Sequence, residues 1–188
     1  MEEAVKGERT VLFMDAVHFF YSTLLGYVWS KTRCFLSSQA GRKRYSVLGA
    51  VNAVSKKMTC CSTDAAINAR IVCKLLKMIH LEYYGKTITI VLDNARYQHC
   101  ELVKRYTKIL HVELLFLPAY SPNLNLIERF WKYLKKQVLY SRFHKTYDIF
   151  KQSIEECMAN AFINDKENID RLLNLEFQSF KKVKILPV

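Results

Sequence analysis

Two apolar stretches of the chain, TVLFMD at residues 10–15 and TITIVLD at residues 87–93, each end in an aspartate. Continuous apolar and β-branched runs of this length are typical of strands that are buried on both faces of a sheet. Aspartate is a poor strand residue and is costly to bury, so two such endings are informative. If the strands are adjacent and parallel, Asp15 and Asp93 meet at the carboxyl edge of the sheet, where open α/β folds place their sites.

The rest of the hydrophobic pattern predicts further strands and helices around these two strands. We expect strands at 45–54, 58–62 and 112–117, and helices at about 64–83, 96–110, 124–139, 147–162 and 167–180. Strands come first and then alternate with helices. This order indicates an α/β fold, with a mixed β-sheet of about five strands and helices on both faces.

Length and composition indicate one folded domain. The 188 residues, 51% of them hydrophobic, fit a single domain 1–188, with a core at about 9–145 and a helical C-terminal extension at 146–188. The six cysteines form no Cys-x-x-Cys pair, which favours free thiols in a reducing cytoplasm over a zinc site or disulfides. No apolar run approaches the roughly 18 residues that a membrane span needs.

The charge of the chain favours a polyanionic partner. Lysine and arginine total 29 against 17 acidic residues, a formal net charge of +12, and nucleic acid is the commonest partner of such proteins. A solvated basic surface without a partner is the alternative. Two basic clusters, the second interleaved with aromatic residues, are our candidates for contacts with DNA phosphates. They consist of Arg42, Lys43 and Arg44, and of Arg129, Lys132, Lys135 and Lys136.

A third carboxylate, Glu128, lies on the helix predicted at 124–139. At about 100° per residue, Glu128 falls beside the apolar stripe of this helix, with Lys132 and Lys135 on the same edge. Glu128 can therefore lean over the sheet while the lysines face a phosphate backbone. The alternative is a Glu–Lys pair on a solvated face, just as either aspartate taken alone can simply begin a turn.

Three segments together resemble the mariner-like superfamily of DDE transposases, and in particular its bacterial insertion-sequence members. These segments are FMDAVHF, VLDNARYQH and LPAYSPNLNLIERFWKYLKK, and the 34 residues between Asp93 and Glu128 match the spacing of that superfamily. The resemblance implies a ribonuclease-H-like fold in which Asp15, Asp93 and Glu128 bind two divalent ions, Mg²⁺ or Mn²⁺. It also implies metal-dependent DNA cleavage and strand transfer, the chemistry of DNA transposition.

The resemblance also implies partners and a setting. Relatives act as dimers on transposon ends and target DNA, and they read those ends with helix-turn-helix modules that precede the catalytic domain. Only 14 residues precede Asp15, so we expect no such module here and consider a separate upstream polypeptide as its source. A bacterial, nucleoid-associated cytoplasmic location follows. One departure is Gln98, which stands where relatives often carry a histidine; we assign no catalytic role to the neighbouring His99.

Two alternatives remain beside an active transposase. A ribonuclease H or junction resolvase shares the fold, but the late position of Glu128 favours the transposase arrangement. The first long helix offers only Glu82, at its far end, as the extra acid of a ribonuclease H. A decayed transposase that only binds DNA without sequence preference is the second alternative. The presence of all three acids argues against decay of the site.

Overall fold

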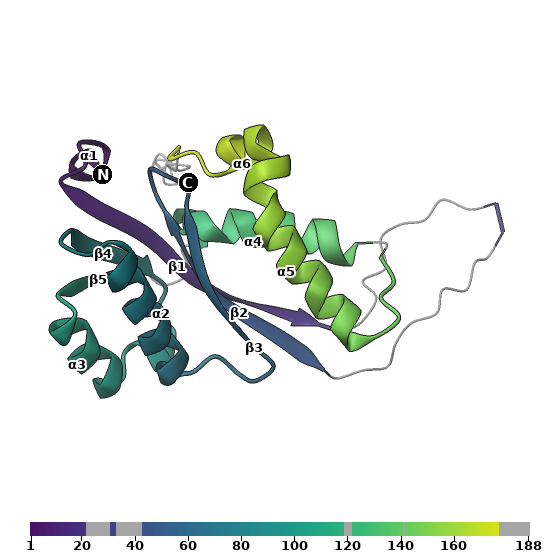
Figure 1. Cartoon of the computed structure of the whole chain (residues 1–188), viewed down its shortest axis with the longest axis horizontal. Helices are drawn as coiled ribbons and strands as arrows, with labels where there is room; N and C mark the ends of the chain where they lie inside the picture. The colour runs from purple at the N-terminus through teal and green to yellow at the C-terminus, as the bar shows by residue number, and fades with distance from the viewer. Residues whose placement is uncertain (22–30, 33–42, 119–121, 141, 177–188) are drawn as a thin grey trace, which may run out of the picture.

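A five-stranded mixed sheet forms the centre of the molecule (Figure 1). The computed structural model describes residues 1–21, 31–32, 43–118, 122–140 and 142–176. The strand order is β3-β2-β1-β4-β5; β1, β2 and β3 are antiparallel neighbours, whereas β4 and β5 run parallel to β1. The strands are β1 (Arg9–Phe20), β2 (Arg44–Asn52), β3 (Met58–Thr63), β4 (Thr87–Leu92) and β5 (Val112–Phe116).

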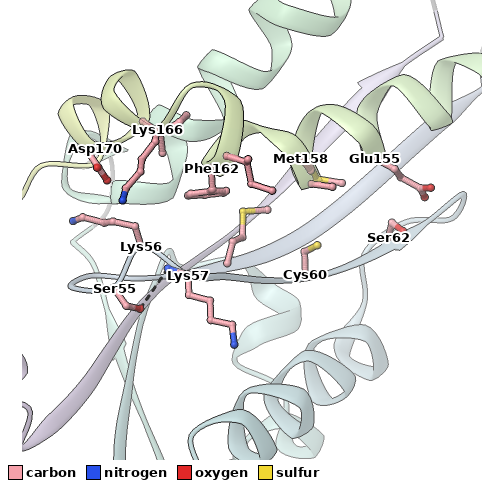
Figure 2. Close-up of a pocket in the computed structure, with 14 residues that line it drawn as sticks. Ser55, Lys56, Lys57, Cys60, Ser62, Glu155, Met158, Phe162, Lys166 and Asp170 are labelled. Atoms are coloured by element: carbon pink, nitrogen blue, oxygen red, sulfur yellow. Dashed lines mark hydrogen bonds between the residues drawn. The ribbon is translucent and has the colours of Figure 1, made fainter.

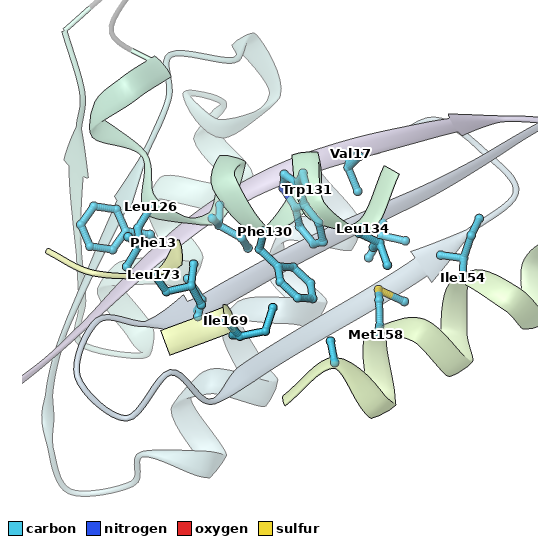
Figure 3. Packing of buried hydrophobic residues seen from close by; sticks show 14 of the residues in the cluster. Phe13, Val17, Leu126, Phe130, Trp131, Leu134, Ile154, Met158, Ile169 and Leu173 are labelled. Atoms are coloured by element: carbon cyan, nitrogen blue, oxygen red, sulfur yellow. The ribbon is translucent and has the colours of Figure 1, made fainter. Parts of the chain in front are cut away.

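Helices cover both faces of this sheet, and alternate residues of β1 point into two separate cores. Leu12 and Met14 pack with α2 (Ala69–Glu82) and α3 (Glu101–Ile109). Phe13 and Val17 face the other side and pack with the carboxyl-terminal helices (Figure 3). Those helices are α4 (Leu126–Leu139), α5 (Tyr147–Asn164) and α6 (Lys166–Leu172). The chain therefore has the ribonuclease-H-like α/β architecture that the sequence predicted.

The C-terminal extension belongs to the same hydrophobic core. Phe150, Ile154 and Met158 of α5 are buried in the cluster that α4 forms with the sheet, as is Ile169 of α6 (Figure 3). Short elements complete the described chain: α1 (Glu2–Val5) and the 3-10 turns η1 (Arg96–Gln98) and η2 (Pro122–Leu124). None of the helices in the described ranges is long and apolar enough to cross a membrane.

The prediction that the first strand ends at Asp15 is wrong, because β1 continues to Phe20. From Leu12 to Met14, β1 is paired on both sides, with β2 and with β4; from Asp15 onward it is paired with β2 alone. The apolar run thus includes the part of β1 that lies between two neighbours. Asp15 is the first residue after the end of the β1–β4 ladder.

Three predicted helices also have different boundaries in the structure. The helix expected from Asp64 begins at Ala69, because Asn68 caps it by accepting hydrogen bonds from the backbone N–H groups of Arg70 and Ile71. The helix expected at 96–110 is divided into η1 and α3 by the extended backbone of Cys100. The helix expected at 167–180 ends at Leu172, and residues 177–180 lie outside the described part of the chain.

Phe130 is the aromatic centre of the packing between α4 and α5, and its truncation should test that packing. Its fully buried ring stacks on Phe162 of α5 at a centroid distance of 5.2 Å. Phe130→Ala should lower the free energy of unfolding by about 3–5 kcal/mol, because it leaves a cavity between the helices. Urea unfolding measures the loss. Phe143→Ala is the matched control, since that ring is 50% exposed and its removal should cost far less.

Candidate active site

The sheet places Asp15 and Asp93 side by side in the backbone register. Met14 of β1 pairs with Leu92 of β4, and each aspartate is the next residue of its chain. β4 ends at Leu92 while β1 continues, so the two carboxylates lie where the ladder between these strands opens. Both aspartates are partly buried. The sheet edge predicted from the two apolar runs therefore exists at this point.

Glu128 is brought to the same place by α4. It lies in the first turn of this helix, and α4 packs across β1 and β2. Asn125, the residue before the helix, is almost completely buried, and its side-chain N–H donates to the carbonyl oxygen of Met14 at 3.2 Å. A buried side chain thus ties the start of α4 to the strand residue that precedes Asp15.

Burial and mutual repulsion perturb these acids. Burial raises the pKa of Asp15 to about 7, assisted by the negative charges of Asp93 and Glu128 and opposed by the Ala16 N–H and by Lys135. Burial also raises the pKa of Glu128; the charge of Lys132 opposes this rise, while that of Asp93 adds to it. The three carboxylates therefore act on one another, and the basic edge of α4 compensates them in part.

The oxygen atoms of the three carboxylates suit a hard divalent cation, although the described side chains are not yet close enough together to ligate one. Carboxylate oxygens are the ligands that Mg²⁺ prefers, and a partly buried cluster of like charges gains from a cation. Within the described ranges no three acidic, histidine or cysteine side chains converge closely enough to ligate one ion. The arrangement thus provides the ligand chemistry of a metal site, with side chains that would have to draw together around the ion.

The loop that follows Asp93 is held by a small network. The Asn94 side chain donates to the carbonyl oxygen of Leu117 at 2.6 Å and is paired with the His99 ring at 3.2 Å. The His99 ring stacks on Phe116 of β5 at a centroid distance of 4.0 Å. His99 therefore fixes the backbone beside Asp93 to the neighbouring strand, which is a structural role that the sequence did not reveal.

Two further residues near the acids also escaped the sequence analysis. Tyr97 lies in η1, close enough to Asp93 and Asp15 that their charges, after burial, raise the pKa of its phenol. Gly49 of β2 is the direct cross-strand partner of Asp15. An aromatic residue four positions after the aspartate was the only available sign of Tyr97. Nothing local distinguishes Gly49.

The predicted basic residues have different environments. Lys132 and Lys135 lie near the acids, since their charges lower the pKa of Glu128, and Lys136 is exposed on the same helix. Lys43 lies over the Tyr147 ring at 5.2 Å, and Arg44 begins β2. Arg42 lies outside the described residues.

Arg129 has an intramolecular role. Its guanidinium donates to the carbonyl oxygens of Leu172, Asn174 and Glu176 at 3.0–3.2 Å, and so holds the chain that follows α6 against α4. That role accounts for its charge without DNA. The contact of Arg129 with DNA stays a prediction.

A cleft also lies in another part of the molecule. A cleft of about 810 Å³ separates β3 from α5 and α6, and is lined by Met58, Cys60, Met158 and Phe162 among others (Figure 2). None of the three acids lines it. We assign the chemistry to the carboxylates and not to this cleft, because the cleft wall is mainly apolar, although Lys56, Lys57, Glu155, Lys166 and Asp170 also line it.

The raised pKa of Asp15 predicts how stability depends on pH without divalent ions. A carboxyl group whose pKa rises from 3.8 to about 7 on folding stabilises the fold below pH 4, and this contribution is lost as pH rises to 7. Asp15→Asn should therefore raise the thermal midpoint at pH 8 in EDTA and change it much less at pH 4. Asp170→Asn, an exposed acid of α6, is the control. An equal effect of Asp15→Asn at both pH values would contradict the assignment.

Solved structures share the fold. The Mos1 strand transfer complex matches with a TM-score of 0.63 and 17% identity, over 87% of this chain and 50% of the other. The catalytic domain of Mos1 mariner transposase matches with a TM-score of 0.60 and 14% identity, over 87% and 74%. A simian T-cell lymphotropic virus intasome structure matches with a TM-score of 0.52 and 13% identity, over 87% of this chain and 46% of the other. The chain spans about half the length of the first Mos1 chains that it matches.

Sequence comparison identifies the family. A search of curated protein sequences found no match. The family described as DDE superfamily endonuclease matches residues 10–151, a range that contains all three acids and the strands and helix that carry them. The chain therefore belongs to the DDE superfamily endonucleases.

Proposed function

We propose that this domain cleaves DNA and transfers the cleaved strand, as in the transposition of an insertion sequence, with Asp15, Asp93 and Glu128 as its catalytic residues. The observation that carries the proposal is the position of these three acids at one opening of the sheet, on β1, after the end of β4 and in the first turn of α4. Each charge shifts the pKa of at least one of the others or is shifted by it. Partly buried acids that repel one another destabilise a fold, so three of them at one opening of the sheet indicate a functional site and not a structural one.

The cofactor in this proposal is a pair of Mg²⁺ or Mn²⁺ ions held by the three carboxylates. Mos1 structures with Mg and with Mn support the choice of ion. When bound, such ions supply positive charge that activates the attacking hydroxyl and stabilises the leaving oxygen. The residues of the chain hold and orient these charges. Near neutral pH, Asp15 must release its proton before it can ligate, because its pKa without metal is about 7.

The DNA in this proposal lies along the basic edge of α4. Lys132 and Lys135 compensate the acids electrostatically, and the same charges can bind phosphates on either side of the scissile bond. The Mos1 transposase paired-end complex with a left transposon end supports transposon DNA as a partner. We propose target DNA as a second partner and a dimer as the acting form. Recognition of end sequences needs groove contacts, which we assign to a helix-turn-helix region or polypeptide outside this domain.

A ribonuclease H arrangement is less well supported. It would require an acid of the first long helix at the site, and Glu82 is the candidate. The Glu82 carboxylate instead accepts a hydrogen bond from Thr59 at 2.6 Å and pairs with Lys57 at 2.9 Å. Glu82 is thus bound to β3 at the edge of the sheet. This geometry favours the transposase assignment.

Removal of a single acid tests the proposed chemistry. Asp93→Ala should abolish nicking of supercoiled plasmid in Mg²⁺ or Mn²⁺, with a loss of at least about 10³-fold, because positioned cations are the main source of rate in phosphoryl transfer. The variant should fold, and metal should no longer raise its thermal midpoint. Glu101→Gln, which removes an exposed acid of α3, is the matched control. Retained nicking in Asp93→Ala would refute its catalytic role.

The salt dependence of binding tests the basic edge of α4. The dissociation constant for duplex DNA should be on the order of 10⁻⁴–10⁻⁶ M at physiological salt, and each lost phosphate contact should reduce the slope of log affinity against log salt by about 0.9. Replacement of Lys132, Lys135 and Lys136 by alanine should therefore flatten the slope. The control replaces Lys77, Lys104 and Lys108, exposed on α2 and α3. Equal slopes for the two triple variants would place the DNA elsewhere.

A further inference from the structure

Gly49 of β2 lies directly against α4, in contact with Trp131 and Ile127. It faces Asp15 across the β1–β2 ladder, so the two residues share the face that α4 covers. A Cβ atom placed on Gly49 would lie 2.7 Å from Cη2 and 2.9 Å from Cζ2 of Trp131, and 3.2 Å from Cδ1 of Ile127. Carbon atoms pack at about 3.5–4.0 Å, so no larger residue fits here without movement.

The atoms that would clash cannot easily move aside. Trp131 is only 4% exposed, and its ring is packed beside Phe130 at a centroid distance of 5.5 Å, within the cluster between α4 and the sheet (Figure 3). Ile127 is fully buried. Protein interiors are close-packed, so a methyl group on Gly49 would push the helix and not only one side chain.

The two residues that rest on Gly49 flank Glu128 in the same helical turns. Ile127 precedes Glu128, and Trp131 follows it by three positions. Asn125 also attaches the start of α4 to the sheet, through a hydrogen bond to the carbonyl oxygen of Met14. The height of Glu128 above Asp15 is therefore set by an attachment at the start of α4 and by the contact of Trp131 and Ile127 with Gly49.

We propose that Gly49 is a positioning residue for Glu128: the missing side chain sets the distance between α4 and Asp15. The inference rests on the proposed function, in which Glu128 and Asp15 share the metal ions. Restoring ordinary carbon contacts around a Cβ requires a movement on the order of 0.5–1 Å. A misplacement of that size in a catalytic group can reduce a rate by about 10²-fold.

The test compares Gly49→Ala, Trp131→Phe and the double variant. Phenylalanine removes the outer ring atoms that the new methyl group would meet. Gly49→Ala should lower the turnover rate of plasmid nicking by about 10–100-fold with an unchanged KM for DNA. In a protein that already carries Trp131→Phe, Gly49→Ala should lower the turnover rate of plasmid nicking by less than about threefold. Ile79→Val, a fully buried position in the opposite core, controls for a general loss of stability.

A second readout does not depend on activity. The rise of the thermal midpoint with added Mn²⁺ should be smaller in Gly49→Ala than in the wild type, and should recover in the double variant relative to Trp131→Phe. A wild-type protein that responds to Mn²⁺ but does not nick DNA would refute the proposed function, while this comparison still tests the positioning. Full nicking by Gly49→Ala beside an active wild type would overturn the positioning alone.

The test also covers the case in which Gly49→Ala fails to fold. If Gly49→Ala does not fold, the double variant carries the test, because the clash is assigned to Trp131. A folded double variant that nicks at the rate of Trp131→Phe supports the inference. A double variant that is unfolded, or folded but much slower than Trp131→Phe, would show that the methyl group disturbs something else and would overturn it.

Discussion

The close packing of α4 on the β1–β2 ladder is the constraint on which the site depends. The helix lies directly above the rung that joins Asp15 and Gly49, with Trp131 resting on the glycine and Asn125 bonded to the carbonyl oxygen of Met14. Because α5 and α6 pack in turn on α4 and the same face of the sheet, the carboxyl-terminal half of the chain reinforces this one contact. This packing brings Glu128 of α4 close to the two aspartates.

Lysine residues of α4 offset part of the negative charge of the site. Burial of Asp15 and Glu128 raises the folding cost of the apo protein, because burial raises the pKa of both carboxyl groups, that of Asp15 to about 7. Lys132 and Lys135, one and two turns after Glu128, offset part of that cost. One helix therefore supplies an acid, the charges that compensate it and the apolar stripe that fixes its height. A divalent ion would complete the balance.

The opening of the sheet is a consequence of unequal strand lengths. β1 is paired with β4 up to Met14 and with β2 as far as Phe20, so Asp15 emerges beside the end of β4 while its backbone remains held on one side. Asp93 follows β4 directly, and the network of Asn94, His99 and Phe116 anchors its loop to β5. The first aspartate is thus on a continuous strand and the second on a loop.

The sequence by itself determined the elements and the acids, because burial on a strand or a helix leaves a local periodic pattern. The two apolar runs and the stripe on α4 were readable in that way, whereas the spacing from Asp93 to Glu128 was informative only through the resemblance to the mariner-like superfamily. Only the tertiary structure decided what depends on contacts between distant segments. It extended β1 beyond Asp15, used Arg129 to hold the chain after α6, and required a glycine opposite Asp15. A missing side chain leaves no pattern in the sequence; its meaning appears only when Trp131, 82 residues later, occupies the space.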